Sequence, residues 1–190
     1  ETIQKSLDAY LETKRQLFPR FYFLSNDDLL EILGQSRDPE QVQKHIKKCF
    51  EGIKQLQLIP PGTRGNKHFE AKGMTAPDGE AVTFEKHVHV YGAVEMWLIE
   101  IEKMMIRTMQ KVVSESMVAV RGKKEKWIKE FPGQLLITTG MIMFTNDCTR
   151  QLGQVQNGKR NALKQQKKKQ ISYLNRLADL VRQPLDRIVR

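Results

Sequence analysis

Apolar residues recur at intervals of three and four along most of the chain, and this spacing is typical of helices with one buried face. The first stripe covers residues 3–18 and should end at Pro19, because proline disfavours helical geometry in the residue before it. The longest stripe covers residues 94–120, roughly seven turns at about 3.6 residues each, and should end at Gly122. The pattern therefore predicts a mainly α protein.

Two shorter helices are expected between these stripes, since each is preceded by a residue that can cap it. Ser25 can accept a hydrogen bond from an amide of the first turn, and the helix behind it should end at Gly34, a natural C-terminal cap. Asp38 is the second cap, with Pro39 at the first helical position, where its missing N–H costs nothing. The apolar spacing behind Asp38 predicts a helix that continues through Leu56.

One region alternates between apolar and polar residues instead. Residues 81–90 follow period two, which predicts a strand, and the turn sequence Ala-Pro-Asp-Gly at 76–79 precedes them. We expect residues 66–75 and 81–90 to form a small β-hairpin inserted between helices. The predicted organisation is a helical subdomain over 1–58, a loop and hairpin insertion over 59–91, and a helical subdomain over 92–190 that ends in a basic helix.

The last part of the chain is expected to contain three more helices after a charged connector at 121–126. The middle one carries an apolar stripe at spacings of three and four. Trp97 and Trp127 are expected to be packing anchors, and Met141 belongs with the methionines that we expect to fill the core. These predicted helices cover residues 127–131, 134–152 and 161–182, and the stripe of the second consists of Ile137, Met141, Phe144, Cys148 and Leu152.

Composition and charge further restrict what kind of protein this chain can be. The 190 residues are 39% hydrophobic and 28% charged, as in an ordinary globular protein with a real core. No run of 18 apolar residues occurs, so we expect no transmembrane helix, and the polar N-terminus lacks the apolar stretch of a secretory signal. Because the chain begins without Met, we expect a fragment or a processed chain. From Gly158 onward ten Lys and Arg face two Asp, so this segment carries eight of the ten net positive charges.

Groups that could support chemistry are few. His87 and His89 lie two apart on the predicted strand, where zinc could bind if a third ligand such as His68 converged; the alternative is a solvent-facing pair. Cys49 and Cys148 occupy apolar helical positions, which favours two buried thiols over a disulfide. No nucleophile motif or phosphate-binding loop occurs. We therefore expect no catalytic, cofactor-binding or metal-binding residue in this chain.

The basic segment 159–170, KRNALKQQKKKQ, could contact phosphate backbones or acidic lipids. Base stacking needs aromatic residues, and Tyr173 is the aromatic residue near it. A membrane-surface helix needs large apolar residues opposite the lysines, whereas glutamines occupy much of this helix. We favour a solvated face, or a face that meets an acidic protein surface, with no membrane partner. A helical nucleic-acid-binding module is the alternative function.

The order of the motifs carries more information than composition does. Residues 18–56, FPRFYFLSNDDLLEILGQSRDPEQVQKHIKKCFEGIKQL, closely resemble the linker region of dynein heavy chains. Leu-Ser-Asn at 24–26 is more similar to axonemal than to cytoplasmic heavy chains, whereas Phe131 stands where the family frequently has Tyr. The resemblance continues in the same order through PDGEAV at 77–82, VEMWLIEIEKMM at 94–105 and WIKEFPGQ at 127–134.

The resemblance implies an elongated helical rod that lies across the ATPase ring of the same heavy chain. Such a linker bends and straightens as ATP is bound and hydrolysed, and its swing moves the motor toward the microtubule minus end. Dynein intermediate and light chains and the microtubule would then be contacted through other regions of the parent. ATP and magnesium would also bind outside this chain, which would be no enzyme by itself. The implied location is the cytoskeleton of the cytoplasm, in the axoneme of a cilium or flagellum.

A lever must transmit force without flexing at every joint, and the aromatic cluster at 18–23 is our candidate for a rigid joint. Bending is expected at a break between helical parts, and the glycine-containing segments 59–66 and 121–125 are two candidates. The joint would form by packing of Phe18, Phe21, Tyr22 and Phe23 against Leu29, Leu30 and Leu33.

Overall fold

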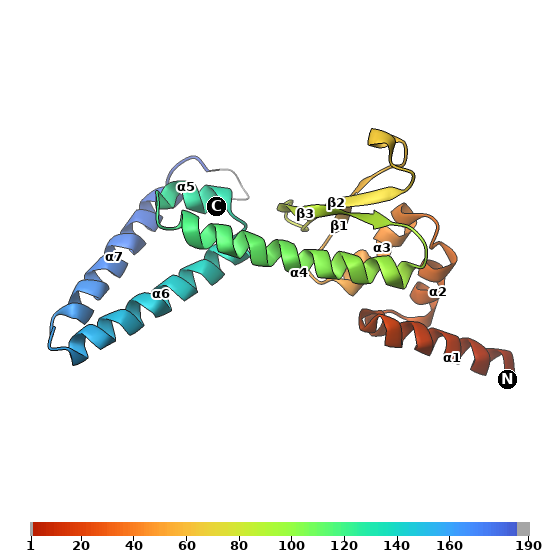
Figure 1. The fold of residues 1–190 in the computed structure, drawn as a ribbon, viewed down its shortest axis with the longest axis horizontal. Helices are drawn as coiled ribbons and strands as arrows, with labels where there is room; N and C mark the ends of the chain where they lie inside the picture. The colour runs from red at the N-terminus through yellow and green to blue at the C-terminus, as the bar shows by residue number, and fades with distance from the viewer. Residues whose placement is uncertain (1, 186–190) are drawn as a thin grey trace. The chain divides into compact units, whose positions relative to one another are not determined.

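Helices dominate residues 2–185, the part of the chain that the computed structural model describes, and a small antiparallel sheet interrupts them (Figure 1). The protein is therefore mainly α, as the apolar spacing predicts. The α-helices are α1 (Thr2–Leu17), α2 (Asn26–Gly34), α3 (Pro39–Cys49), α4 (Val94–Ala119), α5 (Lys124–Glu130), α6 (Gly133–Gln156) and α7 (Ala162–Val181). The strands are β1 (Gln55–Ile59), β2 (Phe69–Thr75) and β3 (Ala81–Val90), and two 3-10 helices are η1 (Pro19–Phe23) and η2 (Thr63–Gly65).

The chain divides into two compact units. The first ends at Met109 and the second begins at Gln110, so the boundary falls inside α4. The three-part division into 1–58, 59–91 and 92–190 stays a prediction. Among the described residues, no helix is both long enough and apolar enough to cross a bilayer.

Helix caps form where the sequence places them. The Ser25 side chain accepts from the amide of Asp28 at 3.2 Å, and Asp38 accepts from the amide of Glu40 at 3.0 Å. The C-terminal cap of α2 differs from the prediction, because Gly34 is still helical and Gln35 caps the helix. A glycine is favoured as a cap where the backbone turns left-handed, and Gly34 does not make that turn.

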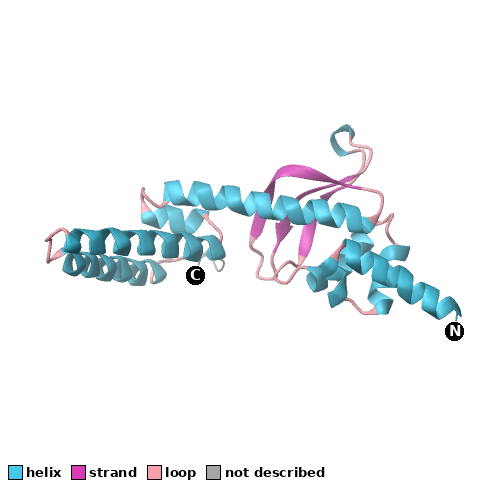
Figure 2. Cartoon of the chain, turned by 60° about the horizontal axis from the view of Figure 1, so that its bottom comes forward, coloured by secondary structure: helices cyan, strands magenta, loops and turns pink. Residues whose placement is uncertain are grey.

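The sheet has the order β1-β2-β3, and both pairings are antiparallel (Figure 2). The predicted hairpin is present as β2 and β3, with Phe69 opposite Val90 and Thr75 opposite Ala81. A side chain at Gly73 would place its Cβ 2.6 Å from the carbonyl oxygen of Val82, so the close approach of these two strands requires glycine there.

The third strand, β1, was not expected from the apolar spacing. The helix predicted to continue through Leu56 ends instead at Cys49, and Leu56 pairs with Met74 in the sheet. Gly52 has a φ of 81°, a left-handed conformation that redirects the chain away from the helix. Residues 53 and 56 fit a helical spacing of three, but Leu56 and Leu58 equally fit the period of a strand.

The core of the first unit lies where the sheet, the N-terminal helices and the first half of α4 meet. The amide of Glu85 on β3 donates to the hydroxyl of Thr108 on α4 at 3.1 Å, so a polar contact also joins the sheet to this helix. Trp97 is buried, as predicted. The buried apolar residues of this core include Leu11, Phe18, Phe21, Leu29, Ile32, Val42, Ile46, Phe50, Leu56, Ala71, Phe84, Val94, Trp97, Leu98 and Ile101.

The second unit contains the helices predicted behind α4, with shifted ends. The short helix α5 begins at Lys124, three residues before the predicted start, and α6 extends to Gln156. Trp127 is buried as predicted, but the predicted stripe of α6 faces outward, and Met141 does not fill a core. Buried residues of this unit include Ser116, Val120, Trp127, Leu135, Thr139, Ala162, Gln166 and Leu180.

Candidate functional site

The aromatic cluster at 18–23 separates into a buried half and an exposed half. Phe18 and Phe21 are 1% and 0% exposed, and their rings meet edge to face with centroids 5.0 Å apart. Phe23 is 72% exposed and Tyr22 is also exposed, so the expectation that all four aromatic residues pack inward is wrong for these two. The 3-10 geometry of η1 explains this difference in burial. At three residues per turn, positions 18 and 21 lie on the same side, and positions 22 and 23 point away from that side.

Arg20 connects three segments around this cluster. Its Nε donates to Glu102 of α4 at 2.7 Å, and an Nη donates to the carbonyl oxygen of Cys49 at 3.1 Å. The guanidinium also lies over the ring of Phe50, 4.8 Å from its centroid. The side chain thus satisfies a carbonyl at the end of α3 while it fixes η1 to α4, whose contact residue lies 82 positions away in sequence.

A second charged contact, between Lys14 and Glu95, fixes α1 to the start of α4. Glu95 is 4% exposed, so its carboxylate is paired inside the protein. The hydrogen bond from Lys14 to Glu95 raises the pKa of Lys14, although burial acts in the opposite direction. Because Glu95 lies in the first turn of α4, its charge also complements the positive end of that helix. Sequence spacing gave no sign that these two residues would meet.

In the second unit a buried polar network joins α4, α5 and α6. The indole N–H of Trp127 donates to the Ser116 hydroxyl at 2.8 Å, and the Thr139 hydroxyl donates to the same oxygen at 2.9 Å. Ser116 and Thr139 are both fully buried. A buried polar group without a partner is costly, so this network specifies one arrangement of the three helices.

The two candidate bending segments have different surroundings. Segment 59–66 connects β1 to β2, which pair with each other along their length. Segment 121–125 connects α4 to α5, and the hydrogen bond from Trp127 on α5 to Ser116 on α4 joins the two helices that it connects. Opening at 59–66 would break a ladder of backbone hydrogen bonds, whereas opening at 121–125 would break the buried hydrogen bonds that Ser116 accepts from Trp127 and Thr139.

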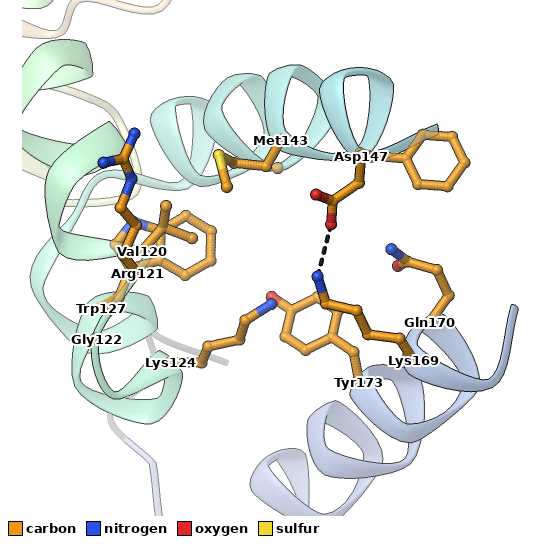
Figure 3. Close-up of a pocket in the computed structure, with 12 residues that line it drawn as sticks. Val120, Arg121, Gly122, Lys124, Trp127, Met143, Asp147, Lys169, Gln170 and Tyr173 are labelled. Carbon is orange, nitrogen blue, oxygen red and sulfur yellow. Dashed lines mark hydrogen bonds and ion pairs between the residues drawn. The ribbon is translucent and has the colours of Figure 1, made fainter. Parts of the chain in front are cut away.

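A cavity of about 280 Å³ lies next to this connection (Figure 3). Lys169 of α7 and Asp147 of α6 form an ion pair at 2.7 Å across it, and Lys124 places its Nζ 3.7 Å from the centroid of the Tyr173 ring. The hydrogen bond from Lys169 holds the pKa of Asp147 below its usual value. The cavity is lined by Val120, Arg121, Gly122, Lys124, Trp127, Gly140, Met143, Phe144, Asp147, Lys169, Gln170 and Tyr173.

The histidines do not converge. His87 and His89 face the same side of the sheet, as their spacing predicts, with their Nδ1 atoms 3.1 and 3.4 Å from the two carboxylate oxygens of Glu70. His68 stacks instead on Tyr91, with ring centroids 4.7 Å apart. Within residues 2–185, no three His, Cys, Asp or Glu side chains come together in a group that could hold a metal ion.

His45 occupies a buried position between α2 and α3. Its two ring nitrogens lie 3.3 Å from Asp28 Oδ1 and 3.3 Å from Glu31 Oε2, but neither contact has the geometry of a hydrogen bond. The imidazole therefore fills space between two helices beside carboxylates rather than acting as a ligand.

The cysteines and the basic helix complete the predicted set. Cys49 is buried, and burial raises the pKa of its thiol to about 11, whereas Cys148 is only partly buried, contrary to the expectation of two buried thiols.

On the basic helix α7, Lys167 and Lys168 are exposed. Tyr173, the aromatic residue considered for base stacking, has its ring covered by Lys124, which disfavours that role. Residues 186–190, counted in the basic tail, lie outside the described residues.

Comparison with known proteins tests the family resemblance. The sequence model of the family described as dynein heavy chain, N-terminal region 2, matches residues 1–116. Over its whole length, the chain is 50% identical to the dynein-1-beta heavy chain of the flagellar inner arm I1 complex of Chlamydomonas reinhardtii. It is 47% identical to human dynein axonemal heavy chain 2 and 37% identical to human dynein axonemal heavy chain 12, again over its whole length.

The chain spans about 4% of the length of the first two of these heavy chains and about 6% of the third. All three alignments cover 100% of this chain, including the blocks at 18–56, 77–82, 94–105 and 127–134 on which the resemblance depends. The chain therefore belongs to the dynein heavy chain family and is similar to its axonemal members.

Proposed function

We propose that this chain is a force-transmitting linker segment of an axonemal dynein heavy chain, a minus-end-directed microtubule motor of cilia or flagella. In this role it contacts the ATPase ring of the same heavy chain. ATP, magnesium, the microtubule and the associated intermediate and light chains are bound by other regions of the parent. The segment itself performs no catalysis.

The observation that carries the proposal is the joint around Phe21 in the first unit. Phe21 has no exposed surface, and Lys14 and Arg20, which precede it in sequence, form ion pairs with α4. An apolar contact resists separation of the segments, and the two charged contacts fix their register. A segment that conveys motion between distant parts of a motor needs this kind of joint, because flexing at the joint would dissipate the displacement.

The linker is proposed to bend and straighten during the power stroke, with the connection at 121–125 as the favoured break within this chain. The buried hydrogen bonds that Ser116 accepts from Trp127 and Thr139 oppose this bend. Breaking such a bond without replacement costs about 1–3 kcal/mol. A free energy of this size is small compared with what a nucleotide-driven motor can supply and large enough to keep the connection closed at rest.

The test uses the full-length motor that contains this segment, with Phe21→Ala compared against Phe23→Ala. Truncation of a buried Phe costs about 3–5 kcal/mol. We expect Phe21→Ala to lower microtubule gliding velocity several-fold more than it lowers ATP turnover. Phe23→Ala removes the same side chain from an exposed position two residues away and should leave both unchanged. Phe21→Leu, which retains most of the volume, should restore gliding.

The ratio of velocity to ATP turnover separates force transmission from general damage. A misfolded motor would lose both quantities together. If the Phe21→Ala motor keeps the stability and the velocity of the parent, or if the two quantities fall in the same proportion, the joint does not transmit force and the proposal fails.

A further inference from the structure

The described lining of the second unit's cavity contains more basic than acidic side chains. Among the described residues, three cationic side chains, those of Arg121, Lys124 and Lys169, line it, and Asp147 is the one lining carboxylate. That carboxylate is already occupied, because Lys169 at 2.7 Å and Arg150 at 2.8 Å both contact it. Two of the cavity's positive charges therefore have no counter-charge among the lining residues that the structure describes.

Lys124 is the most distinctive of these cations. Within the described part of the chain, no carboxylate oxygen lies within 4.0 Å of its Nζ, and its close partner is the face of the Tyr173 ring. Figure 3 shows its side chain pointing into the cavity beside the Asp147–Lys169 pair. Burial, followed by the nearby charges of Lys169 and Arg176, lowers the pKa of Lys124. An anion in the cavity would offset the repulsion from these two like charges.

We propose that this cavity binds a carboxylate side chain from an acidic protein segment, with Lys124 as its principal ligand. This inference goes beyond force transmission and does not depend on it. A volume of about 280 Å³ is near the lower limit of pockets that hold small molecules, about 300–1,000 Å³, and so suits one or two side chains better than a nucleotide.

The rest of the lining agrees with a protein ligand. Trp127, Met143 and Phe144 supply apolar surface on which the methylene groups of a glutamate side chain can lie. The surface outside also carries exposed lysines, at 123 and 129 on or beside α5 and at 167 and 168 on α7, whereas Lys126 is paired with Glu130. Further acidic residues next to the inserted glutamate would therefore also be attracted, which favours an acidic segment over a single isolated carboxylate.

The experiment measures acetylation of individual lysines in the intact heavy chain by mass spectrometry, with and without a hexaglutamate peptide. The peptide should slow acetylation of Lys124 at least about fivefold. A glutamate carboxylate that accepts a charge-assisted hydrogen bond from Lys124 Nζ shields that amine from the reagent. Lys129 on the same helix is exposed and provides the control for charge attraction at the general surface. Hexaglutamine should protect neither residue.

Three variants test which residues bind the peptide. Two should change the concentration for half-protection in opposite directions, and the third is a control. Lys169→Gln removes a lining cation and should raise the peptide concentration needed for half-protection roughly fivefold. Asp147→Asn removes the competing carboxylate and should lower that concentration by a similar factor. Lys168→Gln changes an exposed neighbour outside the lining and should have little effect.

Each other outcome overturns the proposal. Equal protection of Lys124 and Lys129 would mean that the peptide binds the general basic surface. Protection of Lys124 by inorganic phosphate as strong as that by hexaglutamate would assign the cavity to a phosphate-bearing ligand instead. Unchanged acetylation of Lys124 at peptide concentrations that saturate the exposed lysines would show that the cavity binds no acidic segment.

Discussion

Replacement of Ser116 by alanine gives the sharpest test of how the second unit is held together. The substitution removes one hydroxyl that accepts hydrogen bonds from both Trp127 and Thr139. The indole N–H of Trp127 then lies in a buried place without an acceptor. Thr139 can rotate its hydroxyl, so the cost is expected to come mainly from the indole.

The magnitude follows from two opposing contributions. A buried donor left without a partner costs about 1–3 kcal/mol. Alanine is a better helix former than serine by roughly 0.5 kcal/mol, which offsets part of this cost because residue 116 lies inside α4. The net destabilisation should be about 1.5 kcal/mol, which corresponds to a roughly tenfold change in an equilibrium constant.

The assay is hydrogen exchange of the backbone amides of α5 and of the last turns of α4, because the two compact units need not unfold together. Ser116→Ala should lower the protection of these amides roughly tenfold. Ser114→Ala is the matched control, since Ser114 is not buried and its hydroxyl donates only to the carbonyl of Gln110 within the same helix. This control should leave protection unchanged or raise it slightly, through the better helix propensity of alanine.

A double-mutant cycle with Trp127→Phe isolates the hydrogen bond. Once the indole N–H is absent, Ser116→Ala should cost about 1–2 kcal/mol less than in the parent, because no donor is left unsatisfied. If the two substitutions are additive, or if Ser114→Ala and Ser116→Ala lower protection equally, the network does not hold these helices together and the argument for a closed 121–125 connection is wrong.

Three further predictions follow from individual side chains. Among residues 2–185 the buried indole N–H of Trp97 has no partner, so Trp97→Phe should cost at least 1 kcal/mol less in urea unfolding than Trp127→Phe, and an equal or larger cost would contradict this. Lys48, and then Ser25, lower the pKa of Asp28 from 3.8 to about 2, so Asp28 stabilises the fold above pH 3.8 and this contribution is lost as pH falls toward 2. Unfolding midpoints of an Asp28→Asn variant should therefore depend less on pH in that window, and an unchanged pH dependence would refute the role of this pair. Iodoacetamide at pH 8 should modify Cys148 well before Cys49, whose thiol is buried and whose pKa is raised to about 11; peptide mapping that finds Cys49 modified first would contradict its burial.

Features fixed by local chemistry were predictable from the sequence. The caps at Ser25 and Asp38 depend only on residues within the next three positions, and both form. The hairpin at 69–90 depends on a nearby turn and on alternation, and it forms as well. Strand β1 could not be predicted in this way, because its pairing partner is β2, which follows it across a loop.

The candidate sites depend on contacts between distant positions, and sequence reasoning missed most of their residues. Lys14 and Glu95 are 81 positions apart, and Arg20 and Glu102 are 82 apart. Each residue alone has the features of an ordinary charged surface position. The one available signal was the position of Glu95 in the first turn of α4, and helix polarity would have explained that position without any partner.

The stripes of α4 and α6 show why burial needs tertiary information even when periodicity is strong. Both helices carry apolar residues at spacings of three and four, and both spacings correctly predict a helix. On α4, Leu98 and Ile101 are fully buried, because the sheet and the N-terminal helices of the first unit cover them. On α6, Met141 is 66% exposed and Phe144 is also exposed, and Cys148 is only partly buried, so within residues 2–185 little covers that stripe. Periodicity states which face of a helix is apolar, whereas burial depends on whether another segment lies against that face. The composition of an aromatic cluster therefore does not show by itself that the cluster is rigid. It becomes rigid where its residues, such as Phe21, are packed together with elements far away in the sequence.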